Sequence, residues 1–172
     1  EDGELAARTP FGLYRADAFL LAAGAWSGAL ADGLPEVIPV KGEMIALAPP
    51  PSAVFPAPVI WGDRVYLVPR GGRLLVGATV EEAGFDTSLT REGRDELYAR
   101  ARRLMPSLAD WTLADHWAGL RPKSADGRPL LGPTGTDGLY LASGQYRNGI
   151  LFAPAVADLM ADVILGVREP IA

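Results

Sequence analysis

The sequence predicts an α+β fold built around an antiparallel or mixed sheet. Short apolar segments alternate with Pro/Gly turns, notably Pro49–Pro50–Pro51 and Gly71–Gly72, and this pattern is typical of antiparallel strands. Two longer segments, 90–104 and 150–165, have the spacing of helices. The length of 172 residues is enough for one or two small hydrophobic cores.

The first part of the chain is expected to form three short strands, over residues 4–8, 11–15 and 19–23. The third of these is apolar throughout, which is typical of a strand buried on both faces. Gly24 ends this strand, and Ser27 is expected to cap a short helix that extends to Leu30.

The central part of the chain is expected to form the antiparallel sheet, with strands over residues 37–47, 59–61, 64–69, 73–79 and 113–120. The segment 69–73, with its Gly71–Gly72 pair, joins two of these strands as a hairpin. Asp126–Gly127 is typical of a further tight turn, and a last short strand is expected over 139–142.

The two predicted helices differ in character. Segment 90–104 has Leu97, Ala101 and Leu104 on one stripe, Thr90 as its cap and Pro106 beyond its end. Its many charges are of both signs, so they indicate a solvated face. Segment 150–165 has an apolar stripe with small residues around the rest, from which we expect it to be buried.

Composition excludes several classes of function. The chain has 21 acidic and 16 basic residues and a net charge of −5, which argues against a nucleic-acid partner. No apolar run reaches the ~20 residues of a membrane span. The absence of cysteine excludes disulfides and thiolate metal sites, and one histidine leaves no room for a His-rich metal site. The first residues show no secretion signal, so a cytoplasmic location is expected.

The stretch 117–154 is where a binding site is predicted. Arg121 follows an apolar run and precedes a proline, which indicates that its guanidinium is held at a strand end. Its partner is either an acidic residue in a structural ion pair or the carboxylate of a ligand, and composition alone favours the ion pair. His116, beside Trp117 in the same apolar segment, is interpreted as structural and not as a general base.

The segment that follows Gly144 leads into the last helix. A strand–turn–helix junction directs free backbone N–H groups toward an anionic or electron-rich ligand. The alternative is ordinary capping, in which Asn148 satisfies those N–H groups and Arg147 is exposed. Tyr66 likewise has two interpretations, because a tyrosine in a strand is either half-buried packing or a ligand contact.

Several strings of the sequence together identify a family resemblance. These strings are LAAGAWSG (21–28), PVKGEM (39–44), VYLVPR (65–70), VGATVE (76–81), WAGLRP (117–122) and SGQYRNGILFAPA (143–155). In this order they resemble the FAD-dependent amino-acid oxidases, and most closely the glycine oxidases of thiamine biosynthesis. The family's amino-terminal GxGxxG motif does not occur in this sequence.

The resemblance implies a division into three segments. Residues 1–36 are expected to be part of an FAD-binding domain, residues 37–118 an antiparallel-sheet substrate domain, and residues 119–172 a return to the FAD-binding domain. The resemblance therefore implies an α+β fold with two parts. One is a substrate domain with an antiparallel or mixed sheet and a helix, and the other is the carboxy-terminal part of a Rossmann-like FAD-binding domain. A missing amino-terminal FAD-binding segment is the expected partner.

The resemblance also implies roles for particular residues. Arg121, Tyr66 and Arg147 are expected to bind the substrate. The FAD is expected to be contacted by the loop and helix start, that is by Gln145, Tyr146, Arg147, Asn148, Gly149, Ile150 and Leu151. No protein residue is expected to act as a catalytic acid, base or nucleophile, because the cofactor carries the redox chemistry.

The activity implied is the FAD-dependent oxidation of glycine or a similar small amino acid, such as sarcosine or D-alanine, to the 2-oxo acid with hydrogen peroxide. Two alternatives stay open. The chain is a D-amino-acid oxidase or dehydrogenase, or it is a fragment that binds or interacts without independent catalytic activity. The resemblance leaves the electron acceptor and a homo-oligomeric state open.

Overall fold

A computed structural model describes residues 5–169, and Glu4, where the first predicted strand begins, lies outside them. The chain divides into two compact units: unit 1 comprises Glu1–Pro39 and Arg121–Ala172, and unit 2 comprises Val40–Leu120. The resemblance predicts the boundaries between the three segments after residues 36 and 118. The cofactor and substrate roles given to these parts stay predictions, whereas the predicted α+β fold class is confirmed.

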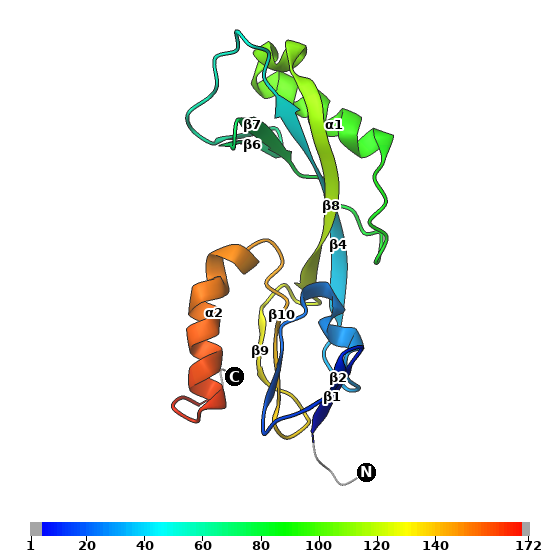
Figure 1. Ribbon diagram of the computed structural model, residues 1–172, viewed down its shortest axis with the longest axis vertical. Coiled ribbons are helices and arrows are strands. Elements are labelled where there is room, and N and C mark those ends of the chain that lie inside the picture. The colour runs from blue at the N-terminus through cyan, green and yellow to red at the C-terminus, as the bar shows by residue number, and fades with distance from the viewer. Residues whose placement is uncertain (1–4, 170–172) are drawn as a thin grey trace. The chain divides into compact units, whose positions relative to one another are not determined.

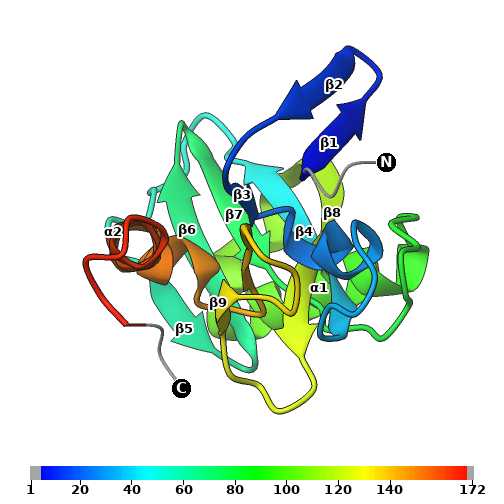
Figure 2. The same ribbon diagram turned by 90° about the horizontal axis from the view of Figure 1, so that it is seen from below.

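Unit 1 combines a hairpin, a small sheet and the last helix (Figure 2). Its elements are β1 (Ala6–Thr9), β2 (Gly12–Arg15), β3 (Phe19–Leu21), the 3₁₀ helix η1 (Gly24–Ala29), β9 (Leu130–Pro133), β10 (Leu139–Ser143) and α2 (Gly149–Ile164). Strands β1 and β2 pair antiparallel, while β10 pairs parallel with β3 and antiparallel with β9. Helix α2 packs along β9 and β10 (Figure 1).

Unit 2 is built on a five-stranded sheet with the order β5-β6-β7-β4-β8. Its elements are β4 (Val37–Ala48), β5 (Ile60–Gly62), β6 (Val65–Arg70), β7 (Arg73–Gly77), α1 (Arg91–Leu104), η2 (Pro106–Asp110) and β8 (Thr112–Ser124). The start of β4, residues 37–39, and the end of β8, residues 121–124, belong to unit 1. The predicted hairpin between β6 and β7 is confirmed, since Arg70 pairs with Arg73 around two glycines with φ of 59° and 73°. Positive φ at both positions matches a type I′ turn.

Helix α1 supplies one side of the core of unit 2. Leu97 and Ala101 are 1% and 0% exposed and pack with Val65, Leu67 and other residues of one sheet face. Thr90 is the N-cap, as predicted, because its hydroxyl oxygen accepts a hydrogen bond of 3.0 Å from the backbone N–H of Gly93. The alternation of β6 therefore turns Tyr66 to the opposite face of the sheet.

Two predictions for the first part of unit 1 are wrong. Strand β3 is not buried on both faces, because Leu20 is 42% exposed. Among the described residues β3 is an edge strand that pairs with β10 alone, which leaves one of its sides open. Ser27 does not cap a helix: it lies inside η1, whose N-cap position is Ala23. The Ser27 side chain is fully buried instead.

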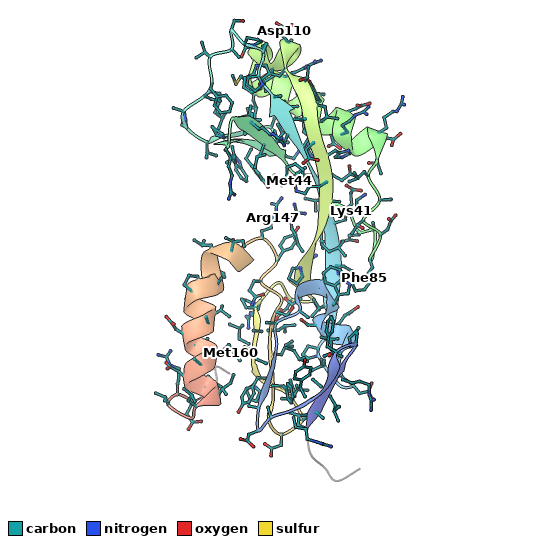
Figure 3. All side chains as sticks on the ribbon, in the orientation of Figure 1. Lys41, Met44, Phe85, Asp110, Arg147 and Met160 are labelled. Atoms are coloured by element: carbon teal, nitrogen blue, oxygen red, sulfur yellow. The ribbon has the colours of Figure 1, made fainter. Side chains whose placement is uncertain are left out.

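The expected burial of the last helix is also wrong. Met160 and Val163 are buried against the sheet, and Figure 3 shows Met160 on the side that faces the strands. By contrast, Ile150 and Leu151 are 93% and 75% exposed. The apolar stripe covers one sheet face only, and in the described residues nothing packs on the other sides of α2. The apolar surface of the helix indicates that it can be buried. It does not indicate which elements of this chain pack against it.

In the part of the chain that the structure describes, no helix combines the length and apolar character needed to cross a membrane.

Candidate functional site

Strands β3 and β10 end side by side in unit 1, because they run parallel. Each is followed by a glycine in the left-handed region, Gly24 with φ of 57° and Gly144 with φ of 76°. The Ser143 hydroxyl donates a hydrogen bond of 2.9 Å to the Gly24 carbonyl and joins the two strand ends. The carboxyl ends of parallel strands are where α/β sheets bind ligands, so this edge is the natural location for a site.

The loop after β10 is anchored to the end of β8. Lys123 and Gln145 form an isolated antiparallel bridge, and the backbone N–H of Tyr146 donates 2.8 Å to the carbonyl of Pro122. Tyr146 has a φ of 50°, which is uncommon for a residue with a side chain. Such strain is found where the surrounding structure fixes a loop in one shape.

This anchoring relates the two arginines that the sequence singled out. Arg121 lies two residues before Lys123 in β8, and Arg147 lies two residues after Gln145, in the turn that follows the bridge. Arg121 is half-buried and Arg147 is exposed, with its guanidinium carbon 5.8 Å from the Tyr146 ring centre. Figure 3 shows Arg147 in the loop that precedes α2.

The N-terminus of α2 lacks a side-chain cap. Asn148 occupies the N-cap position but makes no capping hydrogen bond, so the capping predicted by the alternative is wrong, whereas Arg147 is exposed as that alternative predicted. Beside the first turn lies a pocket of about 260 Å³, lined mainly by small or apolar residues such as Ala22, Ala142, Gly149 and Ala153. A polar helix end next to a small apolar pocket fits the edge of a planar ring with hydrogen-bonding atoms.

Tyr66, the third predicted substrate residue, belongs to unit 2, whereas Arg121 and Arg147 belong to unit 1. Tyr66 is half-buried and stacks on Trp61, with ring centres 5.7 Å apart and planes 21° apart. Its hydroxyl lies 3.7 Å from the sulfur of Met44. The hydroxyl therefore has a weak sulfur acceptor beside it and retains capacity to hydrogen-bond a better one.

The sequence reasoning missed a buried ionic cluster in unit 2. Glu43 is 0% exposed and Lys41 is 2% exposed, and the Lys41 ammonium lies 2.8 Å from a Glu43 carboxylate oxygen. The same ammonium lies 3.1 Å from a carboxylate oxygen of Glu81. Thr90 and His116 complete the group, which we call the Glu43 cluster. A lysine and a glutamate two residues apart in an apolar strand share one face, and this spacing was the available signal.

The Glu43 carboxylate collects several hydrogen bonds. The Thr90 hydroxyl donates to it at 2.8 Å and the Thr90 backbone N–H at 3.1 Å. Nε2 of His116 lies 2.7 Å from its other oxygen. Glu43 thus ties together β4, β8 and the first turn of α1. This contact is consistent with the interpretation of His116 as a structural residue.

The cluster shifts two pKa values in directions that favour the charged forms. Burial opposes the charge of Glu43, but hydrogen bonds from Lys41, Thr90 and His116 outweigh it and hold the pKa of Glu43 below its ordinary 4.5. Burial also opposes the ammonium of Lys41, but hydrogen bonds to Glu43 and Glu81 raise the pKa of Lys41 above 10.5. Both groups are charged at neutral pH.

Known proteins resemble this chain over almost all of it. A family model described as FAD dependent oxidoreductase (DAO) matches residues 2–163. A glycine oxidase of Pseudomonas aeruginosa is 47% identical over 167 residues, which cover 95% of this chain and 45% of that protein. The bifunctional protein ThiO/ThiG of Synechocystis sp. is 47% identical over 161 residues, covering 91% of this chain and 24% of that protein.

A solved structure shares the fold. The glycine oxidase of Bacillus cereus superposes with a TM-score of 0.89 at 32% identity, covering 98% of this chain and 48% of that one. The chain thus spans less than half the length of these relatives. Because the family model extends over nearly the whole sequence, this chain belongs to the DAO family of FAD-dependent oxidoreductases.

Proposed function

We propose that this chain forms part of an FAD-dependent oxidase of glycine or a similarly small amino acid, such as sarcosine or D-alanine. The products are the 2-oxo acid, ammonia or an amine, and hydrogen peroxide, and the role is in thiamine biosynthesis. The observation that carries the proposal is the pairing of the Arg121 strand end with the loop that holds Arg147. The names of the relatives support the substrate class.

The residues of unit 1 fit a flavin at the start of α2. We assign Gln145 through Leu151 to FAD, on the support of the uncapped helix end and the adjoining pocket of mainly small or apolar residues. When bound, FAD supplies the oxidising chemistry by accepting a hydride from the substrate's α-carbon. The backbone N–H groups at this helix end create a positive potential, which stabilises negative charge beside them.

The substrate is held mainly by cationic and hydroxyl groups in this proposal. Arg121 binds the α-carboxylate with its planar fork, since two parallel hydrogen bonds fix both distance and orientation. Arg147 contributes a second positive charge, and the Tyr66 hydroxyl donates a hydrogen bond to the substrate. None of these residues transfers a proton in the reaction; they orient the α-hydrogen, which lowers the barrier by positioning.

The experiment that tests this proposal is Arg121→Lys in the FAD-loaded holoenzyme. A point charge then replaces a bidentate fork, and losing a hydrogen bond to a charged group costs roughly 1.5–3 kcal/mol. The KM for glycine should therefore rise about tenfold or more, with flavin still bound. Arg128→Lys is the matched control, because the Arg128 side chain is 87% exposed and should leave KM unchanged. An unchanged KM in Arg121→Lys would contradict the carboxylate assignment.

The alternative of a D-amino-acid oxidase or dehydrogenase differs in substrate size and electron acceptor. Values of kcat/KM for glycine, sarcosine, D-alanine and D-phenylalanine separate the two activities. A wall of apolar side chains discriminates by roughly 1–3 kcal/mol per methylene, so a graded preference for the smaller substrates is expected. D-phenylalanine as the best substrate would favour the alternative.

A second candidate is that this chain is a fragment without independent catalytic activity. The coverage of 45% of a relative and the lack of GxGxxG in this sequence favour it. The pyrophosphate and ribose sites of FAD belong to that motif, so we expect this chain alone to bind FAD weakly. Stoichiometric flavin absorbance after gel filtration would contradict this expectation. The cytoplasmic location stays a prediction, and the homo-oligomeric state stays open.

A further inference from the structure

A row of residues crosses unit 2 on the sheet face opposite the α1 core. The strand registers pair Trp61 with Tyr66, Tyr66 with Gly77, and Gly77 with Met44. The row therefore reads Trp61, Tyr66, Gly77, Met44 across the neighbouring strands β5, β6, β7 and β4. Three of its members are large side chains, and the third position has none. Figure 3 labels Met44 on β4 at one end of this row.

The Tyr66 ring occupies the space above Gly77. A Cβ built on Gly77 would lie 2.7 Å from both the Cζ and the hydroxyl oxygen of Tyr66, and 2.8 Å from Cε of Met44. Carbon atoms do not approach so closely, so the ring and the methionine end fill the place of a side chain at position 77. The φ of Gly77 lies outside the left-handed region. The need for space, rather than that dihedral, makes this position a glycine.

Trp61 limits the ring from the other side. Its ring stacks on Tyr66 at 5.7 Å between centres, and 70% of Trp61 is exposed. A stacked aromatic neighbour holds a ring in place with little loss of entropy, since only two dihedral angles of tyrosine are fixed. Tyr66 thus lies between the Trp61 indole on β5 and the Met44 thioether on β4. Between them, β7 has a glycine, Gly77, at this position.

We propose that Gly77 is a positioning residue, whose missing side chain lets the Tyr66 phenol lie across β7 and sets where its hydroxyl meets the substrate. The inference rests on the proposed function of Tyr66 in substrate binding. Gly77 itself touches no substrate: it acts through Tyr66. A methyl group at position 77 forces the phenol out of its place, and the hydrogen bond of its hydroxyl to the substrate is then lost.

The test is a double-mutant cycle in the holoenzyme with Gly77→Ala, Tyr66→Ala and the double variant. In Gly77→Ala the KM for glycine should rise about tenfold, as expected for losing a hydrogen bond to a charged group, with kcat changing less. In the Tyr66→Ala background the same change should have no further effect on KM, because no ring is left to displace. A merely structural role of Gly77 would affect both backgrounds equally and would overturn the inference.

A second readout needs neither activity nor flavin. The near-ultraviolet circular dichroism of the chain reports the stacked Trp61–Tyr66 pair, and Gly77→Ala should alter it. Gly135→Ala is the matched control, because a Cβ there meets nothing within 4 Å and its φ is not positive. If Gly77→Ala folds poorly, the double variant should restore the thermal unfolding midpoint. An unchanged spectrum and an unchanged KM in Gly77→Ala would overturn the inference.

The variant Tyr66→Phe distinguishes a failure of the proposed function from a failure of the inference about Gly77. Tyr66→Phe removes only the hydroxyl and should raise KM by itself. If it leaves KM unchanged, the substrate role of Tyr66 is wrong, and the positioning role inferred for Gly77 falls with it. If Tyr66→Phe raises KM while Gly77→Ala changes neither KM nor the spectrum, the proposed function stands and the inference about Gly77 is wrong.

Discussion

At the scale of single residues, Gly77 and Gly93 lie where another side chain occupies the place of a Cβ. Gly93 in the first turn of α1 shows this for the Glu43 cluster. A Cβ at Gly93 would lie 2.8 Å from a carboxylate oxygen of Glu43 and 2.8 Å from the Thr90 hydroxyl. Both groups are fixed by hydrogen bonds to each other, so neither can move without breaking them.

We predict that Gly93→Ala destabilises the chain, although alanine in a helix normally stabilises by about 1 kcal/mol relative to glycine. Crowding of a packed site costs about 1–3 kcal/mol, which outweighs that gain. The free energy of unfolding from urea denaturation should therefore fall. Gly149→Ala in α2 is the control, since the nearest atom to its Cβ is 3.8 Å away, and it should not destabilise. A more stable Gly93→Ala would contradict the crowding argument.

A further residue-scale prediction concerns the charge of Glu43. In Glu43→Gln the shape of the side chain is kept, but the buried Lys41 ammonium loses a charged partner at 2.8 Å. Removing one partner of a buried ion pair costs about 3–5 kcal/mol, and Glu81 reduces this by remaining near Lys41. We expect a loss of about 3 kcal/mol in the free energy of unfolding. Glu96→Gln removes a carboxylate that is 50% exposed in its pair with Arg100, and it should cost less than about 1 kcal/mol.

At the scale of elements, the sequence predicted those features that depend on neighbouring residues in the chain. The β6–β7 hairpin follows from a glycine pair, and the start of α1 follows from Thr90 as a cap. The exposure of α2 and the edge position of β3 could not be predicted, because both depend on which other elements lie beside them. The sequence gives the apolar character of a surface but not the partner that covers it.

The candidate site could also be predicted only in those features that depend on neighbouring residues in the chain. The sequence indicated Arg121 and the segment after Gly144 as separate features. Only the strand pairing showed that the two are joined by the Lys123–Gln145 bridge. The row around Tyr66 could not be predicted either, because it is assembled across four strands whose registers are set by long-range pairing. His116 gave no signal of its contact with Glu43, which lies 73 residues away in sequence.

At the scale of the whole molecule, the cluster predicts how stability depends on pH. The pKa of Glu43 is lowered by folding, so its contribution is present above its ordinary 4.5 and is lost as pH falls from 4.5 through the folded value. The pKa of Lys41 is raised by folding, so its contribution is present below 10.5 and is lost as pH rises from 10.5 through the folded value. Stability should therefore form a plateau between these limits.

Exposed carboxylates also contribute to the loss of stability at acid pH. Backbone N–H donors of Ser88 and Arg128 lower the pKa of Asp86 and of Asp126 respectively, so both carboxylates also add stability that is lost in acid. A profile of the unchanged chain therefore cannot isolate the cluster. A variant that removes only the buried carboxylate can do so, because the exposed groups are the same in both chains.

We predict that Glu43→Gln lowers the plateau and flattens the acid limb. A glutamine does not titrate, so the variant lacks the proton uptake that accompanies unfolding of the unchanged chain below pH 4.5. The difference in free energy of unfolding between the two chains should shrink as pH falls through this range. Urea denaturation at a series of pH values measures it, with Asp126→Asn as a control that changes the acid limb but not the buried cluster. Parallel acid limbs in the unchanged chain and in Glu43→Gln would show that Glu43 does not titrate differently in the folded and unfolded states. The buried hydrogen bonds of Glu43 would then not lower its pKa in the folded state.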